Sequence, residues 1–566
     1  MLPKAPRDPE ARKKRFYIMR DKKVAGSPQP DGTGVQTIYL NNDRLVSFAK
    51  IEGGISDEEV LKCLKSAEGF RRLVYGIGVS VEGEVPEKEV DFCLEMYGSM
   101  EGIPGTCHRA ALRADGMEYF IKCDEIAWKE QDAVPGQIRF EFKKADTIAS
   151  VSVCLYVRDG FPIPEQENEE GVDFESAAYQ ALLQKSLLQK GNNRRFKEVL
   201  DKAKRGERVK VAFIGGSITQ GAWAIPIHQE CYAYRAFAGF CEMAGRTTED
   251  NVEYVKAGVG GTSSELGMVR YEKEVKGQEG TAPDLCVVEF AVNDEGDETG
   301  GESYDCLVRR ILQEKNHPAV VLLFSVFADD QNLQERLRKV GEAYDLPMVS
   351  LKDCLVEQFC KRKEEGRIIS KRQYFYDIYH PNNAGHRIMA DCLLHLWKEM
   401  AQDAPDEEPE EVEKLTPPYG AAFVDLKYLD RKTEIEKEGI VIVPGDFTER
   451  DFDLQMVERN RNTKRTPEFT ENWMHKSGNS PFVLELACKA LLIVEKDSGS
   501  PKAGIAEVFV DGRKVREIDP HEVGWVHCNA LICLKEEKAA RHRIEIAMKP
   551  GEEEKEFTIL AFAYVE

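Results

Sequence analysis

The stretch VAFIGGSITQG, residues 211–221, raises the first chemical question, because an apolar run ends there in two glycines and Ser217. Such a segment is typical of a phosphate-binding loop, of a nucleophile on a tight strand-to-helix turn, or of a plain glycine turn. A GxxxxGK[ST] phosphate loop needs a lysine that is missing here. The GxSxG nucleophile motif is also absent, since Thr219 stands where its second glycine would be. By itself the segment favours the plain turn.

A serine hydroxyl becomes a useful nucleophile only beside a base, and the segment YDIYHPNNAGH, residues 376–386, contains one. Asp377 and His380 are three residues apart. A carboxylate at this spacing can accept the Nδ1–H, fix the tautomer and leave Nε2 to take a proton from a serine. A lone DxxH pattern favours a surface loop or an incidental hydrogen bond. A metal site is disfavoured, because no second His or Cys lies at ligand spacing.

Two more segments contain donors for a negatively charged oxygen. Asn293 ends the apolar run in EFAVNDEGD, and its amide N–H can donate to an oxyanion. The loop AGVGGTSS, residues 257–264, contains glycine N–H groups that can do the same. The simpler interpretation of Asn293 is a turn or a helix cap.

The elements around these residues alternate between apolar strands and amphipathic helices. Strands are expected in VKVAFIGGS, NVEYVKAG, PDLCVVEFAVND, AVVLLFSVF and PMVSL, with helices between them and one over the preceding SAAYQALLQKSLLQK. This alternation predicts a parallel sheet covered on both faces. Ligands of such sheets bind at the carboxyl ends of the strands, where all four candidate segments lie.

Short runs with period-two alternation lie on either side of this middle region, and they predict antiparallel β-sandwiches. VFVDGRKV reads as a hairpin with an Asp-Gly turn. Acidic, turn-rich stretches at residues 163–173 and 401–418 read as linkers. The expected domains are therefore 1–165, an N-terminal arm and β-sandwich; 166–412, the α/β domain with lead-in helices and the acidic linker; and 413–566, a C-terminal β-sandwich. The first two dozen residues read as a flexible basic arm.

The composition excludes several classes of protein. The net charge is −22, which argues against nucleic acid and against an anionic membrane surface as partners. The 15 cysteines include no CxxC pair and read as buried, reduced thiols of a cytosolic protein rather than as a disulfide scaffold. No signal-peptide pattern and no apolar run of about 18 residues is present, so a cytoplasmic location is expected.

The four segments appear once each and in a fixed order, and in this the sequence resembles the SGNH hydrolase superfamily, the GDSL-like esterases. FIGGSITQG, KAGVGGTSS, FAVND and DIYHPNNAGH are similar to that family's first, second, third and fifth blocks. The resemblance covers residues 209–397, about a third of the chain. It implies a flavodoxin-like three-layer α/β/α core with a parallel sheet, here flanked by N- and C-terminal β-sandwich (jelly-roll-like) domains. It also implies ester hydrolysis without metal or other cofactor.

The resemblance assigns a role to each matching residue. Ser217 corresponds to the nucleophile, with its own N–H as one oxyanion donor. Gly261 and Asn293 correspond to the other two oxyanion donors. His380 corresponds to the base and Asp377 to the acid that orients it.

Two details of the match stay open. Gly260 is adjacent to Gly261, so the register of the oxyanion glycine is uncertain. The third block usually reads Gly-x-Asn-Asp, and Ala291 replaces its glycine, a change expected to alter the backbone or the pocket wall beside Asn293.

β-Sandwiches beside such a core resemble the arrangement of carbohydrate esterases that remove acetyl groups. The expected partner is therefore an acylated oligosaccharide or another small ester, with a homo-oligomer left open. A general acyl esterase or thioesterase and a non-catalytic carbohydrate-binding protein are the alternatives, and the sandwiches are alternatively packing or oligomerisation modules. A lipase is disfavoured, because neither an apolar lid nor a membrane-facing helix is visible.

Overall fold

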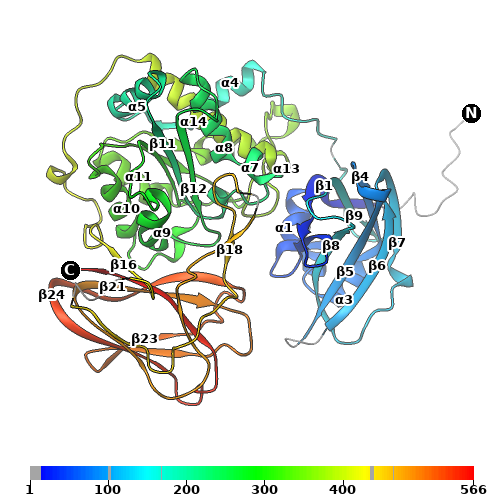
Figure 1. The fold of residues 1–566 in the computed structure, drawn as a ribbon. Helices are drawn as coiled ribbons and strands as arrows, with labels where there is room; N and C mark the ends of the chain where they lie inside the picture. The colour runs from blue at the N-terminus through cyan, green and yellow to red at the C-terminus, as the bar shows by residue number, and fades with distance from the viewer. Residues whose placement is uncertain (1–13, 100–103, 167, 434–438, 463) are drawn as a thin grey trace, which may run out of the picture.

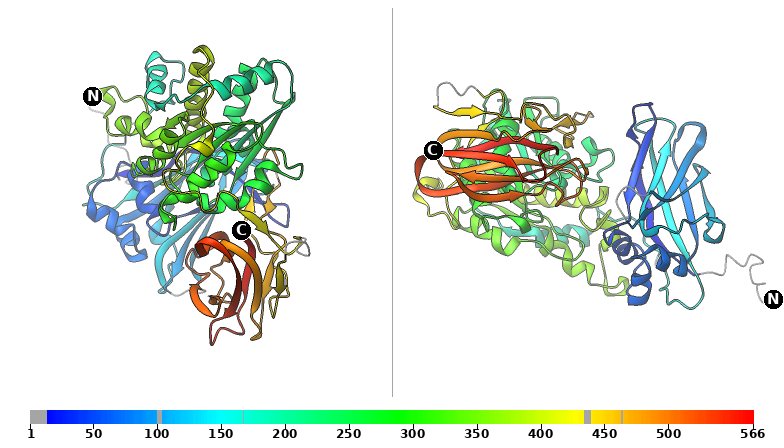
Figure 2. Two further views of the ribbon diagram at one scale, coloured as in Figure 1. Left: turned by 90° about the vertical axis from the view of Figure 1, so that its left-hand side faces the viewer. Right: turned by 90° about the horizontal axis from the view of Figure 1, so that it is seen from below.

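The computed structural model describes residues 14–99, 104–166, 168–433, 439–462 and 464–566. The chain forms three units, and Figure 1 shows the N-terminal and C-terminal β-rich units packed on different sides of a central α/β unit. Figure 2 shows the same arrangement from two further directions.

The central sheet has six strands in the order β10-β15-β14-β13-β11-β12. Five of them are parallel, and β10 runs antiparallel to β15, so the sheet is mixed rather than wholly parallel. Strands β11 and β13 to β15 are buried along their whole length and β12 along all of it except Glu253, as continuous apolar runs predict. The bounds are β10 Leu187–Gln189, β11 Val209–Gly215, β12 Val252–Gly258, β13 Leu285–Glu289, β14 Ala319–Phe324 and β15 Met348–Ser350.

The helix expected over SAAYQALLQKSLLQK is shorter than predicted. Helix α4 covers Ala177–Leu183, a 3-10 turn follows over Gln184–Ser186, and Leu187–Gln189 pair with β15 as strand β10. The local pattern is helical throughout, but pairing with the open edge of the sheet overrides it in the last residues.

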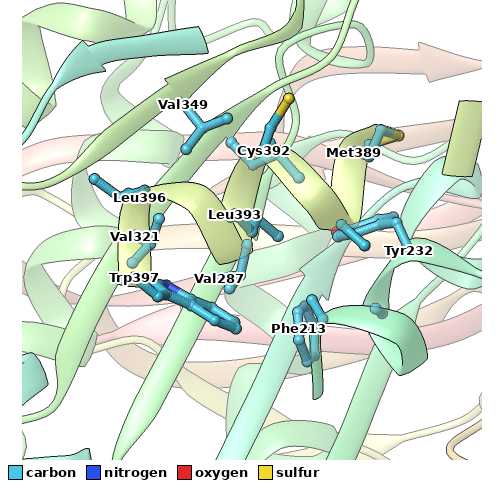
Figure 3. Packing of buried hydrophobic residues seen from close by; sticks show 14 of the residues in the cluster. Phe213, Tyr232, Val287, Val321, Val349, Met389, Cys392, Leu393, Leu396 and Trp397 are labelled. Carbon is cyan, nitrogen blue, oxygen red and sulfur yellow. The ribbon is translucent and has the colours of Figure 1, made fainter. Parts of the chain in front are cut away.

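Helices cover both faces of this sheet and make it a three-layer core. On one face α5, α8, α12 and α14 pack around the fully buried Trp397, and Figure 3 shows Phe213, Val287 and Val321 of the strands facing Leu393 and Leu396 of α14. Helices α9, α10 and α11 cover the other face. The bounds are α5 Arg194–Lys204, α8 Tyr232–Met243, α9 Ser264–Arg270, α10 Glu302–Leu312, α11 Gln334–Ala343, α12 Leu351–Phe359 and α14 Asn383–Gln402.

The N-terminal unit consists of two antiparallel sheets that enclose one apolar core, with strand orders β1-β9-β4-β7 and β2-β3-β8-β5-β6. Three helices that the sequence pattern did not reveal, α1 (Arg44–Ile51), α2 (Glu58–Cys63) and α3 (Ala67–Leu73), also contribute to this core. The strand bounds are β1 Arg15–Ala25, β2 Ser27–Pro28, β3 Gly34–Tyr39, β4 Val74–Glu82, β5 Glu89–Gly98, β6 Pro104–Arg113, β7 Asp115–Lys122, β8 Asp132–Phe142 and β9 Ile148–Val157.

The prediction of a flexible arm over the first two dozen residues is wrong for its second half. Strand β1 begins at Arg15 and pairs antiparallel with β9. Phe16, Ile18, Met19 and Val24 are buried, so the apolar side chains between the charges decide the structure of this segment. Residues 1–13 lie outside the described residues.

Eight strands of the C-terminal unit form one continuous antiparallel sheet, and the short strands β18 (Met456–Val457) and β19 (Thr466–Pro467) pair separately. Its two longest strands, β21 and β24, are paired with register shifts near Cys488, and such irregularities let a strand bend and serve both halves of a sandwich. The predicted hairpin is present, with Asp511 and Gly512 as its two-residue turn. The bounds are β16 Lys427–Leu429, β17 Val441–Val443, β20 Trp473–His475, β21 Phe482–Asp497, β22 Ala506–Val510, β23 Arg513–Ile518, β24 His527–Met548 and β25 Phe557–Val565.

The C-terminal unit shares an apolar core with the central unit. Residues of β21 and β25, such as Leu492 and Ala561, pack in one cluster with Leu266 of α9 and Leu307 of α10. The unit is therefore fixed beside the carboxyl end of the central sheet instead of being tethered by a linker. All 15 cysteines are free, and 13 of them are buried. Among the described residues, no helix is long and apolar enough to cross a membrane.

Candidate active site

The glycines before Ser217 are required by close packing. Strand β11 ends at Gly215, and the short helix α6 (Ser217–Gln220) begins at Ser217. A Cβ on Gly215 would lie 2.3 Å from Thr219 Oγ1, and a Cβ on Gly216 would lie 2.3 Å from Asn293 Oδ1. No side chain fits at either position. The Gly-Gly-Ser turn is therefore built around Asn293 and is not merely a loose strand end.

Ser217, His380 and Asp377 form one hydrogen-bonded line. The distance from Ser217 Oγ to His380 Nε2 is 3.0 Å, and His380 Nδ1 lies 2.9 and 3.0 Å from the two carboxylate oxygens of Asp377. The carboxylate also accepts the backbone N–H groups of Tyr379 and His380. This is the arrangement in which a histidine can take the serine proton.

Asp377 is kept ionised by its surroundings. Burial alone would raise its pKa, but the neighbouring His380 and the hydrogen bonds from His380 and Tyr379 lower the pKa below its ordinary value. A charged Asp377 holds the Nδ1–H of His380 and leaves Nε2 facing Ser217.

Trp223 is a partner of Asp377 that the sequence analysis missed. Its indole N–H donates to Asp377 Oδ2 at 2.7 Å, and its ring stacks on Tyr376 with centroids 4.0 Å apart. The backbone φ of Trp223 is 63°, in the left-handed region that non-glycine residues rarely adopt. No spacing in the sequence links a tryptophan at this position to the DxxH segment.

The N-terminal unit contacts the loop that contains Asp377. Lys22 of β1 donates to the Phe375 carbonyl at 2.7 Å and forms an ion pair with Glu52 at 2.6 Å. Both side chains of this pair are almost completely buried. Burial raises the pKa of Glu52, and Lys22 partly offsets that rise.

Asn293 lies beside the nucleophile, directly against Gly216. It precedes the short helix of residues Asp294–Gly296, but its side chain makes no capping hydrogen bond there. The capping interpretation therefore does not explain its side chain. Ala291 is fully buried within the apolar core, and its effect on the backbone beside Asn293 stays a prediction.

The glycine loop lies on the other side of Ser217. The Gly260 N–H donates to Gln220 Oε1 at 2.8 Å, whereas within the described part of the chain the Gly261 N–H has no acceptor. A Cβ on Gly260 would lie 3.7 Å from the Cβ of Ser217, which places the loop next to the nucleophile. Of the two glycines, Gly261 has the N–H that is available to a ligand.

Three side chains of the C-terminal unit reach this loop, and the sequence analysis identified none of them. Gln455 Nε2–H donates to the Gly260 carbonyl at 2.8 Å, and His527 Nε2 lies 3.1 Å from the Gly261 carbonyl. A Cβ on Gly261 would lie 3.1 Å from the ring of Trp525, whose side chain is 46% exposed. The site is thus assembled where the central and C-terminal units meet.

A buried carboxyl group lies behind the nucleophile. Glu289, the last residue of β13, is completely buried and accepts a hydrogen bond from Thr219 Oγ1 at 3.1 Å. Burial raises its pKa to about 7. Over the described residues, no group of three or more His, Cys, Asp or Glu side chains is arranged to hold a metal ion.

Comparison with known proteins gives one family match, over the central unit, and several matches to solved structures. Residues 213–388 match the model of the GDSL-like Lipase/Acylhydrolase family. A solved two-domain esterase (CEX) active on acetylated mannans is 23% identical with a TM-score of 0.56, and the match covers 68% of this chain and 99% of that one. The same esterase co-crystallized with mannopentaose also gives 23% and 0.56, with 68% and 98% coverage. A family two carbohydrate esterase from Cellvibrio japonicus is 10% identical, with a TM-score of 0.23 and coverage of 69% and 98%. No curated protein matches the chain by sequence.

Proposed function

We propose that this protein is a serine esterase that hydrolyses acyl esters, most of all acetyl esters on carbohydrates. Residues 213–388 match the model of the GDSL-like Lipase/Acylhydrolase family, which supports the proposal. The observation that carries the proposal is the hydrogen-bonded line from Ser217 Oγ through the His380 ring to the Asp377 carboxylate. A non-catalytic binding protein has no need for this geometry.

In the proposed mechanism, His380 Nε2 takes the proton of Ser217 as the serine oxygen attacks the ester carbonyl carbon. The negative oxygen of the tetrahedral intermediate accepts hydrogen bonds from the N–H groups of Ser217 and Gly261 and from the Asn293 amide. The intermediate collapses, the C–O bond to the alcohol breaks, and His380 gives its proton to the leaving oxygen. Water then hydrolyses the acyl-enzyme by the same steps, which releases the acid and restores Ser217.

Two exposed aromatic side chains beside the site support a sugar as the alcohol part of the ester. Trp525 lies against Gly261, and Tyr379, 39% exposed, lies next to His380. Amphipathic aromatic rings offer a flat apolar face to the C–H groups of a sugar ring while their polar atoms stay in water. A structural neighbour is active on acetylated mannans, which is consistent with this substrate class.

The test is to incubate the purified protein with acetylated oligosaccharides and to follow acetate release and oligosaccharide mass. Ser217→Ala is expected to abolish release, whereas Ser80→Ala, in strand β4 of the N-terminal unit, leaves it unchanged. Comparable release by Ser217→Ala would refute the proposal.

The acyl and sugar parts of the substrate are tested separately. Aryl acetate, butyrate and octanoate distinguish an acetyl esterase, which loses activity with longer chains, from a general acyl esterase. Trp525→Ala is expected to raise KM for acetylated oligosaccharides several-fold and to leave KM for the aryl acetate unchanged. Equal effects on both substrates would count against Trp525 as a sugar contact.

A further inference from the structure

We propose that Gln455 of the C-terminal unit positions and polarises the peptide group that supplies the Gly261 N–H to the oxyanion. This inference rests on the proposed esterase function and extends it. It assigns to the C-terminal unit a role in orienting an oxyanion donor.

The geometry of one peptide group carries the inference. The C=O of Gly260 and the N–H of Gly261 belong to the same planar unit and point in opposite directions. Gln455 Nε2–H donates to that C=O at 2.8 Å. Fixing the carbonyl therefore fixes the direction of the N–H, and a donor on the carbonyl makes the N–H a stronger donor in turn.

Gln455 is itself held in this orientation. Its Oε1 accepts the backbone N–H of Cys528 at 2.9 Å, and its side chain is 8% exposed. The donor chain thus runs from Cys528 in β24 through the Gln455 amide to the Gly260–Gly261 peptide. Hydrogen bonds in such a chain polarise and strengthen one another.

The next peptide group of the loop is held in the same way. His527 Nε2 lies 3.1 Å from the Gly261 carbonyl, while its Nδ1 lies 2.7 Å from Asp497 Oδ2. Gly261 has a φ of 76°. Two successive glycines have no Cβ to restrict the backbone, so by itself this loop could adopt many conformations. An oxyanion donor must be oriented before the reaction, so bonds from outside the loop replace the rigidity that the loop lacks.

Two substitutions of Gln455 remove its hydrogen-bond donor while keeping the approximate size of the side chain. Gln455→Glu keeps the length and an acceptor for the Cys528 N–H but has no donor for Gly260. Gln455→Met keeps the approximate volume and removes both polar groups. Each is expected to lower kcat about 10- to 100-fold on an aryl acetate with KM within about 3-fold. This loss is smaller than the roughly 10²- to 10³-fold loss for a missing donor, because the N–H is still present.

A second measurement distinguishes positioning from general damage to the fold. A boronic acid adds to a catalytic serine as a tetrahedral anion, so its affinity follows stabilisation of the transition state. Its Kd should rise in the Gln455 variants in proportion to the fall in kcat/KM. The matched control is His475→Gln, because His475 is also buried in the C-terminal unit but lies against Phe447 and the Lys555 and Gly478 carbonyls, none of which belongs to the site. This control should lower Tm without changing kcat or the boronate Kd.

The outcomes separate this inference from the proposed function. Folded Gln455 variants with kcat and boronate Kd within about 3-fold of wild type would overturn the inference while leaving the esterase intact. Losses as large in His475→Gln would overturn it as well. If Gln455→Glu and Gln455→Met do not fold, Gln455→Asn decides the question by the same two measurements, because it keeps the amide but shortens its reach to the Gly260 carbonyl. An inert wild-type protein, or an active Ser217→Ala, would instead refute the proposed function.

Discussion

The Trp223 indole N–H donates to Asp377 at 2.7 Å, and it comes from the loop that follows the nucleophile helix. The loop that follows the nucleophile helix therefore holds Asp377 directly, in addition to the link from Ser217 to Asp377 through His380. Because Asp377 also accepts two backbone N–H groups, its carboxylate can rotate little. This rigidity keeps the His380 ring in the plane that faces Ser217.

Trp223→Phe tests that contact. Phenylalanine keeps a ring to stack on Tyr376 but removes the hydrogen bond to Asp377. A bond to a charged group contributes about 1.5–3 kcal/mol, so kcat is expected to fall by roughly 10-fold or more. Loss of a donor to the charged form also raises the pKa of Asp377, which should move the acidic limb of the kcat/KM profile to higher pH. A profile and a kcat unchanged from wild type would mean that the other donors suffice.

The proposed catalytic residues are expected to differ in severity. Ser217→Ala and His380→Ala should each lower kcat about 10⁶-fold, and Asp377→Ala about 10⁴-fold, because an unoriented imidazole still accepts a proton. Asn293→Ala should cost about 10²- to 10³-fold as the loss of one oxyanion donor. Steady-state kinetics on one acetyl ester ranks the four variants. A nearly wild-type Asp377→Ala would indicate a Ser-His dyad or another carboxylate.

The buried pair of Lys22 and Glu52 gives a prediction for stability. Lys22→Met leaves Glu52 buried without its cation, and breaking such a pair typically costs about 3–5 kcal/mol. The double variant Lys22→Met/Glu52→Gln should recover much of that loss, because no isolated charge remains. Chemical denaturation of the three proteins measures the difference. Equal losses in the single and double variants would show that the Phe375 contact, and not the charge of Glu52, decides stability.

The sequence predicted those parts of the site that are local. Ser217, Asn293 and the DxxH segment each follow their own strand or precede their own helix, so the order of the segments and the rule for strand ends place them together. Gln455, His527 and Lys22 have no such signal. They reach the site because whole units pack together, and no spacing within one segment records that packing.

The fold shows the same division. The five parallel strands were predictable because each is an apolar run between amphipathic helices. Strands β10 and β1 were not predictable, because each forms by pairing with a strand that is distant in the sequence. Local propensity yields to such pairing wherever a sheet edge is open.

Glu289 gives the last prediction, which concerns the pH dependence of stability. In the unfolded chain its pKa is near the ordinary 4.5, and in the folded protein burial raises the pKa to about 7. Between these values the folded state keeps a proton that the unfolded state has lost. The folded state is therefore favoured by protons, and stability must fall as pH rises from about 4.5 to about 7 and then level off.

Glu289→Gln isolates this contribution, because glutamine stays neutral and its oxygen can still accept the hydrogen bond from Thr219. The shift corresponds to about 3 kcal/mol at most. The gain of the variant over wild type should therefore rise from about 1 kcal/mol at pH 5, just above the unfolded pKa, to about 3 kcal/mol at pH 8, about one unit above the folded pKa. The difference between the two proteins must be used, since burial also raises the pKa of Asp294 to about 7 and of Glu265 to about 9. Those groups titrate equally in both proteins and cancel in the difference.

Urea denaturation of wild type and Glu289→Gln at a series of pH values supplies the measurement. Parallel curves for wild type and variant would show that Glu289 is ionised in the folded protein, and a smaller gain at pH 8 than at pH 5 would reverse the predicted sign.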